Sequence, residues 1–509
     1  MARTIRRLLI GSATAMILAG GLANAQVAPT ANKAAAQSLS VESTWQQRTE
    51  RDVEAAYRLL KDNHPAASAD AHDPAFVTRL NKAHTIAVQR AASVTSLAGY
   101  NATLRGFAYS MGDGHIWSHP TSEESDINWA GIIVAKRAAD WVVVREDPAL
   151  VGSDIVGSRL ISCDNKPISK FAKQVLSFRA VAGDAAMETM RAARLLMDDG
   201  NPFIKRPSAC RFQTKGNTSL LTLNWQKANI DQLQKSYWKP VPGNAGYGVR
   251  AVDGGYWVSI EALDPKAQLV IDKVAANSSV IRKARYVVVD LRGNFGGNDL
   301  YGRKLADTLY GPNYVRNRLG PIGGGCPSTF RASTDNIAAT RGYIRDFETS
   351  GDVDGAAEYK KALQAMEAAR KKGMELTGGI FCKSISSETH EAASSLIRTP
   401  VMVLTDVGCF SSCINTVGYF VKLGAIQVGQ MTGSDTHYSE VREISLPSQL
   451  STFSTMMALM PDAPARIGPF IPTVPYNGEI SNTEALEAWI PVYALRRMPG
   501  ASRHPAAAF

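Results

Sequence analysis

The chain has 509 residues, of which 45% are hydrophobic and 20% are charged. This composition excludes a disordered or fibrous protein, and the length suggests about three domains. The formal net charge is +10, but both signs are mixed along the chain, without long basic blocks or interleaved aromatic residues. The charge therefore favours a solvated surface with a slight preference for anions over a nucleic-acid-binding protein.

The N-terminus has the order of a secretory signal peptide. The first seven residues carry three arginines and no acid, residues 8–22 are apolar, and Ala23-Asn24-Ala25 supplies small residues. We predict cleavage after Ala25 rather than a membrane anchor, because the apolar run is short and interrupted by glycines. Residues 1–25 are then a signal peptide and residues 26–40 a linker, and we expect an exported protein, periplasmic or secreted, without stable membrane insertion.

Helical periodicity begins after the linker. Val53, Ala56 and Leu60 form an apolar stripe, and Leu104 with Phe107 belongs to the last clear stripe. The spacing predicts an N-terminal helical domain over residues 41–125. Its last helix ends at Gly112-Asp113-Gly114-His115, where two glycines leave His115 on a turn.

The hydrophobic period then changes to two. Residues 131–134 and 141–144 predict strands, and residues 221–225 close the unit. This pattern predicts a β-rich domain over residues 126–240, ending near a linker at residues 240–244.

Strands alternate with helices in the third region, which predicts an α/β domain over residues 241–500. A buried strand around Val287 leads into Gly293-Asn294-Phe295-Gly296-Gly297, whose glycines allow backbone amides to approach a ligand. Residues 314–399 form a long insertion with helical spacing. Both a lid and a solvated decoration remain open for it.

A second apolar strand, at residues 400–404, ends at a turn containing Asp406 and Gly408. Helical spacing resumes at Ile414, so Ser411 and Ser412 lie near a helix N-terminus, where backbone N–H groups favour negative charge. A serine there can also simply cap the helix. Pairing this strand with the strand at Val287 would place the glycine-rich loop beside Ser411.

Six cysteines follow the signal peptide, and export would place them in an oxidising compartment. Neighbourhood along the chain favours three disulfides, although buried thiols remain an alternative. No Cys-x-x-Cys or tight histidine cluster accompanies them, so no metal site is predicted. The expected pairs are Cys163 with Cys210, Cys326 with Cys382, and Cys409 with Cys413.

These motifs resemble those of the tail-specific, or C-terminal-processing, serine proteases. Asp290-Leu291-Arg292-Gly293-Asn294-Phe295-Gly296-Gly297 is similar to the family's glycine-rich signature, and Cys409-Phe410-Ser411-Ser412-Cys413 resembles its nucleophile turn. Asp113-Gly114-His115 resembles a motif of the branch that contains tricorn protease and the interphotoreceptor retinoid-binding proteins. The resemblance implies a multidomain α/β protein, with a PDZ-like β-rich domain and a catalytic core like that of ClpP and crotonase.

The chain departs from the family at the base. Processing enzymes of this family use a Ser-Lys dyad, but residues 423–441 contain no lysine, and Ile414 stands where a glutamate is usual. The tricorn-like branch instead uses histidine, whose pKa of about 6.5 suits proton transfer near neutral pH. By this resemblance His115 is the expected base and His437 the runner-up. The acidic partner remains open among Asp435, Glu440 and Glu443.

The resulting prediction is an exported serine peptidase that acts on a peptide or protein without a metal or organic cofactor. Ser411 attacks the carbonyl, His115 is the base, and the amides of Gly296 and Ser412 bind the oxyanion. The PDZ-like domain would deliver the peptide. The alternative is a catalytically silent protein that binds a peptide or an apolar ligand on the same scaffold. An α/β-hydrolase esterase is disfavoured, because no Gly-x-Ser-x-Gly elbow surrounds Ser411.

Overall fold

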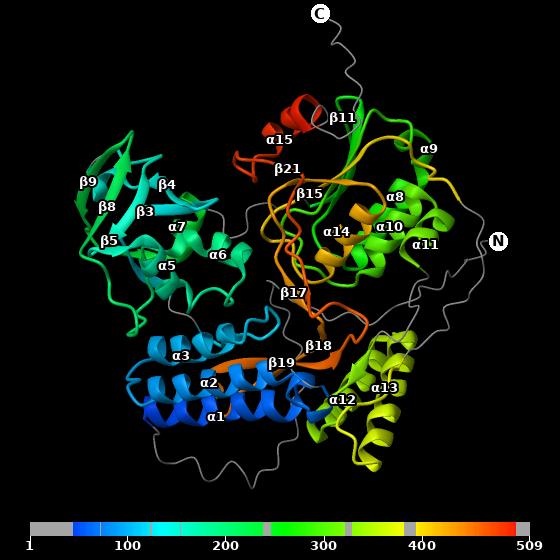
Figure 1. The fold of residues 1–509 in the computed structure, drawn as a ribbon, viewed down its shortest axis with the longest axis horizontal. Coiled ribbons are helices and arrows are strands. Elements are labelled where there is room, and N and C mark those ends of the chain that lie inside the picture. The colour runs from blue at the N-terminus through cyan, green and yellow to red at the C-terminus, as the bar shows by residue number, and fades with distance from the viewer. Residues whose placement is uncertain are drawn as a thin grey trace, which may run out of the picture.

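The computed structural model describes residues 44–71, 73–122, 125–152, 154–237, 246–320, 328–380 and 393–494 (Figure 1). The predicted signal peptide, both predicted linkers and the proposed Cys326–Cys382 pair lie outside the described residues. Among the residues described, no helix is both long and apolar enough to cross a membrane.

A six-stranded sheet forms the centre of the α/β part, with the order β11-β12-β13-β15-β16-β21. All neighbours are parallel except β11 and β12, and Val287 lies opposite Val401, which is the strand pairing that the sequence predicts. The strands are β11 (Tyr247–Val252), β12 (Gly255–Ile260), β13 (Val287–Asp290), β15 (Val401–Thr405), β16 (Ile426–Gly429) and β21 (Val474–Pro475).

Apolar clusters cover both faces of this sheet, so its central strands are buried on both sides and read as continuous apolar runs. Helices α8, α10, α11 and α14 gather on one side and α15 lies on the other (Figure 1). Their bounds are α8 (Pro265–Ala276), α9 (Ser278–Ile281), α10 (Leu300–Tyr310), α11 (Pro312–Leu319), α14 (Ser412–Lys422) and α15 (Thr483–Trp489). The predicted mixed α/β class is confirmed.

A separate β-rich unit lies beside the sheet domain (Figure 1). Its main sheet has the order β3-β4-β5-β8-β9, and the predicted disulfide between Cys163 and Cys210 joins opposed residues of β5 and β8. Its strands are β3 (Ile132–Arg137), β4 (Asp140–Glu146), β5 (Arg159–Cys163), β6 (Lys166–Pro167), β8 (Ala209–Thr214) and β9 (Asn217–Thr222). A smaller sheet contains β2 (Asp126–Trp129), β7 (Met197–Asp198) and β10 (Gln226–Asn229). The helices are α4 (Pro148–Val151), α5 (Ile168–Leu176), α6 (Ala185–Arg191) and α7 (Ile230–Ser236).

The N-terminal helices α1 (Trp45–Asn63), α2 (Pro74–Ala91) and α3 (Leu97–Ser110) complete their core with strands from far along the chain. These strands are β18 (Tyr438–Ser445) and β19 (Ser451–Leu459), which run beside the helices in Figure 1. The rings of Phe107 and Phe453 are 5.6 Å apart. The predicted helical domain over residues 41–125 therefore shares its core with a hairpin that the sequence analysis assigns to the α/β domain.

The hairpin also fixes the segment after α3. Strand β1 (Ser118–Pro120) pairs with β19, and Ser454 Oγ donates to the carbonyl oxygen of His115 at 2.8 Å. His115 is thereby held at the junction between the helical unit and the rest of the molecule.

The insertion forms a helical hairpin of α12 (Thr334–Ser350) and α13 (Val353–Lys371). It packs with β14 (Thr329–Phe330) against β19, and Ser333 Oγ donates to Asn63 Oδ1 at 2.7 Å. The hairpin therefore lies against the helical unit (Figure 1). The role of the insertion stays a prediction.

Candidate functional site

Ser411 occupies a strained turn between β15 and α14. Its φ of +55° is in a region that non-glycine residues rarely adopt, and such strain costs about 1–3 kcal/mol. Surrounding contacts hold the turn in place: Phe410 N donates to Asn294 O at 3.2 Å, and Gly433 N donates to Cys409 O at 2.8 Å. The sequence-predicted nucleophile thus lies on a sharp strand-to-helix connection.

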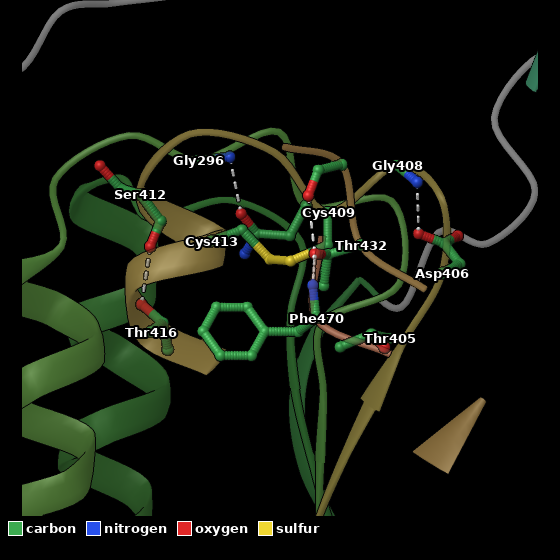
Figure 2. Close-up of a disulfide and its surroundings, with 12 residues drawn as sticks. Gly296, Thr405, Asp406, Gly408, Cys409, Ser412, Cys413, Thr416, Thr432 and Phe470 are labelled. Carbon is green, nitrogen blue, oxygen red and sulfur yellow. Dashed lines mark hydrogen bonds between the residues drawn. A yellow bond between two sulfur atoms is a disulfide. The ribbon is translucent and has the colours of Figure 1, made fainter. Parts of the chain in front are cut away.

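The predicted disulfide between Cys409 and Cys413 brackets this turn (Figure 2). The two Cα atoms are 5.4 Å apart, within the usual range for a disulfide of about 4.4–6.8 Å. Both cysteines are fully buried. The bridge links the residue two positions before Ser411 to the first turn of α14 and stiffens the connection.

The glycine-rich loop after β13 lies directly against the turn. A Cβ atom on Gly296 would lie 2.9 Å from both Ser411 Cβ and Ser412 N, and the φ of Gly296 is +104°. Asp406 ties the two segments together, because its Oδ1 accepts from the amides of Gly293 and Gly408, each at 2.9 Å. Only glycine fits at position 296 without moving the turn.

The two amides predicted to bind an oxyanion differ in their partners. The amide of Gly296 donates to Asn294 Oδ1 at 2.8 Å, so this donor already has an acceptor. The amide of Ser412 begins α14 and has no acceptor among the described residues. The side chain of Ser412 donates to Gly297 O at 2.6 Å and fastens the glycine loop to the helix.

His115 meets Ser411 across the boundary between the helical unit and the sheet domain. Its Nε2 lies 3.1 Å from Ser411 Oγ, within hydrogen-bond distance. The ring of Phe410 packs beside the imidazole with a centroid separation of 4.8 Å. A Cβ on Gly114 would lie 2.4 Å from the Phe410 ring, which explains the glycine before the histidine.

The other nitrogen of His115 faces two carboxylates. Nδ1 lies 3.0 Å from Asp435 Oδ1 and 3.7 Å from Asp113 Oδ1, which are ion-pair distances without the angles of a hydrogen bond. Thr436 holds both acids, since its amide donates to Asp435 Oδ1 at 2.7 Å and its hydroxyl to Asp113 Oδ2 at 2.6 Å. Sequence reasoning named Asp435 only as one of three candidates for the acidic partner and gave Thr436 no role.

The other two candidate acids lie elsewhere. The carboxyl of half-buried Glu440 accepts a hydrogen bond from Tyr359 Oη. Glu443 contacts Trp117 Nε1 at 2.8 Å and His119 Nδ1 at 3.4 Å. Of the three, the structure brings only Asp435 to the imidazole of His115.

Burial and the two neighbouring acids act in opposite directions on the pKa of His115. Burial by itself lowers the pKa of His115, but the charges of Asp435 and Asp113 outweigh it and raise that pKa above the ordinary value. Burial also raises the pKa of Asp113, with a further contribution from Asp435 and against the charge of His115. The carboxylates therefore favour the imidazolium that forms when a histidine accepts a proton.

Asp113, His115 and Asp435 could also act as metal ligands, since one ligand atom from each lies within 4.8 Å of the others. They are the one such group of three found in the described part of the chain. The nitrogen of His115 that could bind such a cation is Nδ1, because Nε2 faces Ser411. The cation would then come between Nδ1 and the carboxylate of Asp435.

The structure does not bring the runner-up base, His437, into any described contact with Ser411. Its ring contacts Tyr438 with a centroid separation of 4.5 Å, and Tyr438 in turn packs against His64 and Phe76 of the helical unit. None of the contacts described for His437 reaches Ser411. It belongs to the packing of β18 on the N-terminal helices.

The Asp-Leu-Arg part of the glycine-rich motif is structural. Asp290 and Arg292 form a buried ion pair at 2.7 Å, and Trp257 Nε1 donates to the same carboxylate. Arg292 also donates to Ile480 O at 2.6 Å and to the hydroxyl of Thr483 at 3.0 Å. The pair therefore fastens the segment before α15 to the sheet.

An open cleft of about 890 Å³ lies between the β-rich unit and the sheet domain. Strands β3 and β4 and helix α6 form one wall, while Val407, Gln430 and Met431 contribute to the other. Val407 lies four residues before Ser411 in the chain, so this wall includes the segment that leads into the nucleophile turn. Most of its lining is apolar.

The sequence matches no known family model and none of the curated proteins. Solved structures do match. A mature CPAF complexed with lactacystin is 15% identical, with a TM-score of 0.51 over 84% of this chain and 94% of that chain. A serine-to-alanine mutant of CPAF is also 15% identical, with a TM-score of 0.53 over 85% of this chain and 93% of that one.

The photosystem II D1 C-terminal processing protease matches as well, at 14% identity, with a TM-score of 0.30 over 86% of this chain and 95% of that chain. Identities this low establish a shared fold and nothing finer, and that conclusion rests on the CPAF structures. The resemblance to the tail-specific protease group, predicted from two motifs, is confirmed as a likeness of fold.

Proposed function

We propose that the protein is an exported serine peptidase in which Ser411 is the nucleophile and His115 the general base. The observation that carries the proposal is the 3.1 Å contact between His115 Nε2 and Ser411 Oγ, with Asp435 on the other ring nitrogen at 3.0 Å. A nucleophile, a base and a group that orients the base is the arrangement that activates a serine hydroxyl. Peptide specificity is suggested by the tail-specific protease motifs and by the fold shared with CPAF.

In the proposed reaction, His115 takes the hydroxyl proton of Ser411 as the oxygen attacks the peptide carbonyl. Asp435 and Asp113 stabilise the imidazolium, which then returns the proton to the leaving amine. The amide of Ser412, at the N-terminus of α14, holds the oxyanion. The amide of Gly296 joins it when Asn294 Oδ1 releases it. Substrate reaches Ser411 through the cleft beside the β-rich, PDZ-like unit.

Labelling with a fluorophosphonate probe tests this proposal directly. The folded wild-type protein is expected to react covalently, and Ser411→Ala is expected to abolish labelling and hydrolysis of a denatured protein substrate. Ser219→Ala is the matched control, because that serine is exposed on β9, in the β-rich unit. Labelling that survives in Ser411→Ala would reject Ser411 as the nucleophile.

A catalytically silent binding protein is the second candidate. The occupied amide of Gly296 and the apolar lining of the cleft favour it. It predicts no labelling of the folded wild type, together with saturable binding of a peptide or an apolar fluorescent probe. Met431→Asp, in the wall of the cleft, would then weaken binding.

A further inference from the structure

Asp406 joins the two segments that form the proposed site. It follows β15 directly and its side chain is fully buried. Its Oδ1 accepts from the amide of Gly408, in the nucleophile turn, and from the amide of Gly293, in the glycine-rich loop, both at 2.9 Å. Figure 2 shows the first of these bonds. One carboxyl oxygen thus links the segment carrying Ser411 to the segment carrying Gly296.

The nucleophile turn and the glycine-rich loop are closely packed around Asp406. A Cβ atom on Gly408 would lie 3.1 Å from Asp406 Oδ1 and 3.2 Å from Gly293 Cα, so the two loops touch at this point. The other hydrogen bonds between them lie further along, at Phe410 and Ser412. Without an acceptor on Asp406, two buried amides would lose their partner where the turn begins, at a cost of about 1–3 kcal/mol each.

The second oxygen of Asp406 is in a different environment. Oδ2 is buried and has no hydrogen-bond partner among the described residues. Burial raises the pKa of Asp406 to about 7, against the two amide hydrogen bonds. The charged groups that face it are Asp290 and Arg292, which pair with each other at 2.7 Å. The carboxyl group can therefore accept both amides through Oδ1 while Oδ2 carries the proton.

We propose that Asp406 is a positioning residue that acts in its uncharged form, fastening the nucleophile turn to the glycine-rich loop and thereby setting Ser411 against the oxyanion-binding amides. This role rests on the proposed peptidase function. Loss of the proton creates a buried charge at Oδ2 with no partner, which favours water entry and loosening of the two loops. Activity then falls as Asp406 ionises.

Two substitutions separate the acceptor from the charge. Asp406→Asn keeps an oxygen for both amides and cannot ionise, whereas Asp406→Ala removes the acceptor. We expect kcat of the Asn variant within about threefold of wild type, and kcat of the Ala variant lower by about tenfold or more with KM little changed. Asn as damaged as Ala, or Ala with wild-type kcat, would overturn the proposal.

The dependence on pH tests the uncharged form. The ratio of kcat for the Asn variant to kcat for wild type should be constant below about pH 6 and rise above about pH 7. A ratio that stays constant up to about pH 9 would overturn this part of the proposal.

Amide hydrogen exchange supplies a readout that does not need activity. Exchange at Gly293 and Gly408 should be faster in Asp406→Ala than in wild type and unchanged in Asp406→Asn, with circular dichroism reporting the overall fold. Equal exchange rates at Gly293 and Gly408 in wild type and in a folded Asp406→Ala variant would overturn the inference. A wild type that resists the fluorophosphonate probe yet shows the expected exchange would instead reject the peptidase function alone.

Discussion

The two sides of the proposed site are built in contrasting ways. The nucleophile side comes from two adjacent parallel strands, β13 and β15, whose C-terminal ends meet at one edge of the sheet. The base side combines Asp113 and His115, which follow α3, with Asp435 and Thr436, about 320 residues later in the chain. The first is local to one sheet, and the second exists only where several parts of the fold meet.

The two sides are therefore held in place by different contacts. The turn at Ser411 is held by a disulfide, by Asp406 and by a glycine loop with no spare room. The backbone of His115 is held by Ser454 of β19, and its imidazole faces Asp435 in the segment before β18. Changes on the nucleophile side should therefore act through geometry, and changes on the base side through proton transfer.

The largest effect is expected for His115→Ala. Without a base at 3.1 Å from Ser411 Oγ, kcat/KM should fall by about 10³-fold or more. His437→Ala is the matched control and should retain activity, because its ring packs on Tyr438. Steady-state kinetics of both variants decide the assignment, and an active His115→Ala would end it.

Gly296→Ala tests the nucleophile side by steric means. The added methyl group would lie 2.9 Å from Ser412 N and 2.9 Å from Ser411 Cβ, and the φ of +104° is unfavourable for alanine. We expect kcat to fall by about 10²-fold while the overall fold is retained. Gly424→Ala is a control with a similar positive φ of +97° but open space around it. Equal kcat values for the two variants would contradict the tight docking of the loop on the turn.

Asp435→Asn probes the orientation and charge of the base. The base must be neutral, so kcat/KM should rise with pH through a midpoint above about 6.5, the direction in which the acids raise the pKa of His115. Removing the charge of Asp435 leaves burial to lower this pKa, so the midpoint should move to lower pH. We also expect kcat to fall by about 10-fold to 10²-fold. A pH profile identical to wild type would show that Asp435 does not act on His115.

The same pKa has a consequence for stability. A histidine whose folded-state pKa is raised stabilises the fold below its unfolded pKa, and that contribution is lost as pH rises through the folded-state value. The free energy of unfolding should therefore depend less on pH, between about 6 and 8, in Asp435→Asn than in wild type. Urea unfolding at several pH values measures this difference.

The smallest effect on activity is expected from the disulfides. Replacing Cys409 and Cys413 by serine opens a short loop, worth about 2 kcal/mol, and should lower kcat a few-fold by loosening the turn at Ser411. Replacing Cys163 and Cys210 opens a loop of 47 residues, worth about 4 kcal/mol, and should leave kcat unchanged. The Cys163–Cys210 bridge should thus matter more for stability and the Cys409–Cys413 bridge more for activity. Thermal unfolding and kinetics of the two double variants check this.

Sequence reasoning succeeded where the signal is local. The apolar strands ending at Asp290 and Thr405, the glycines at 296 and 297 and the helix after Ser411 are each encoded within a few residues, and parallel strand pairing brings them together. The two disulfides that lie within the described residues follow the predicted pairing by neighbourhood.

The remaining features depend on contacts that local patterns do not encode. Nothing in the local sequence of β18 and β19 indicates that these strands pack on α1–α3, so the shared core was missed. Asp435, Glu440 and Glu443 lie close together in sequence, and only the tertiary fold decides which of them faces His115. The sequence around Asp406 indicates only a turn residue, and its second amide partner, Gly293, lies in the loop after another strand, β13.

The hairpin of β18 and β19 also determines when, during synthesis, the proposed catalytic site can assemble. A nascent chain that has emerged only as far as α14 already contains Ser411 and His115, but it lacks Asp435, Thr436 and the Ser454 hydroxyl that holds the His115 backbone. The proposed base is thus positioned only after the late strands have been translated and have folded back onto the first helices. In a peptidase, this delay would protect the incomplete chain from its own active site.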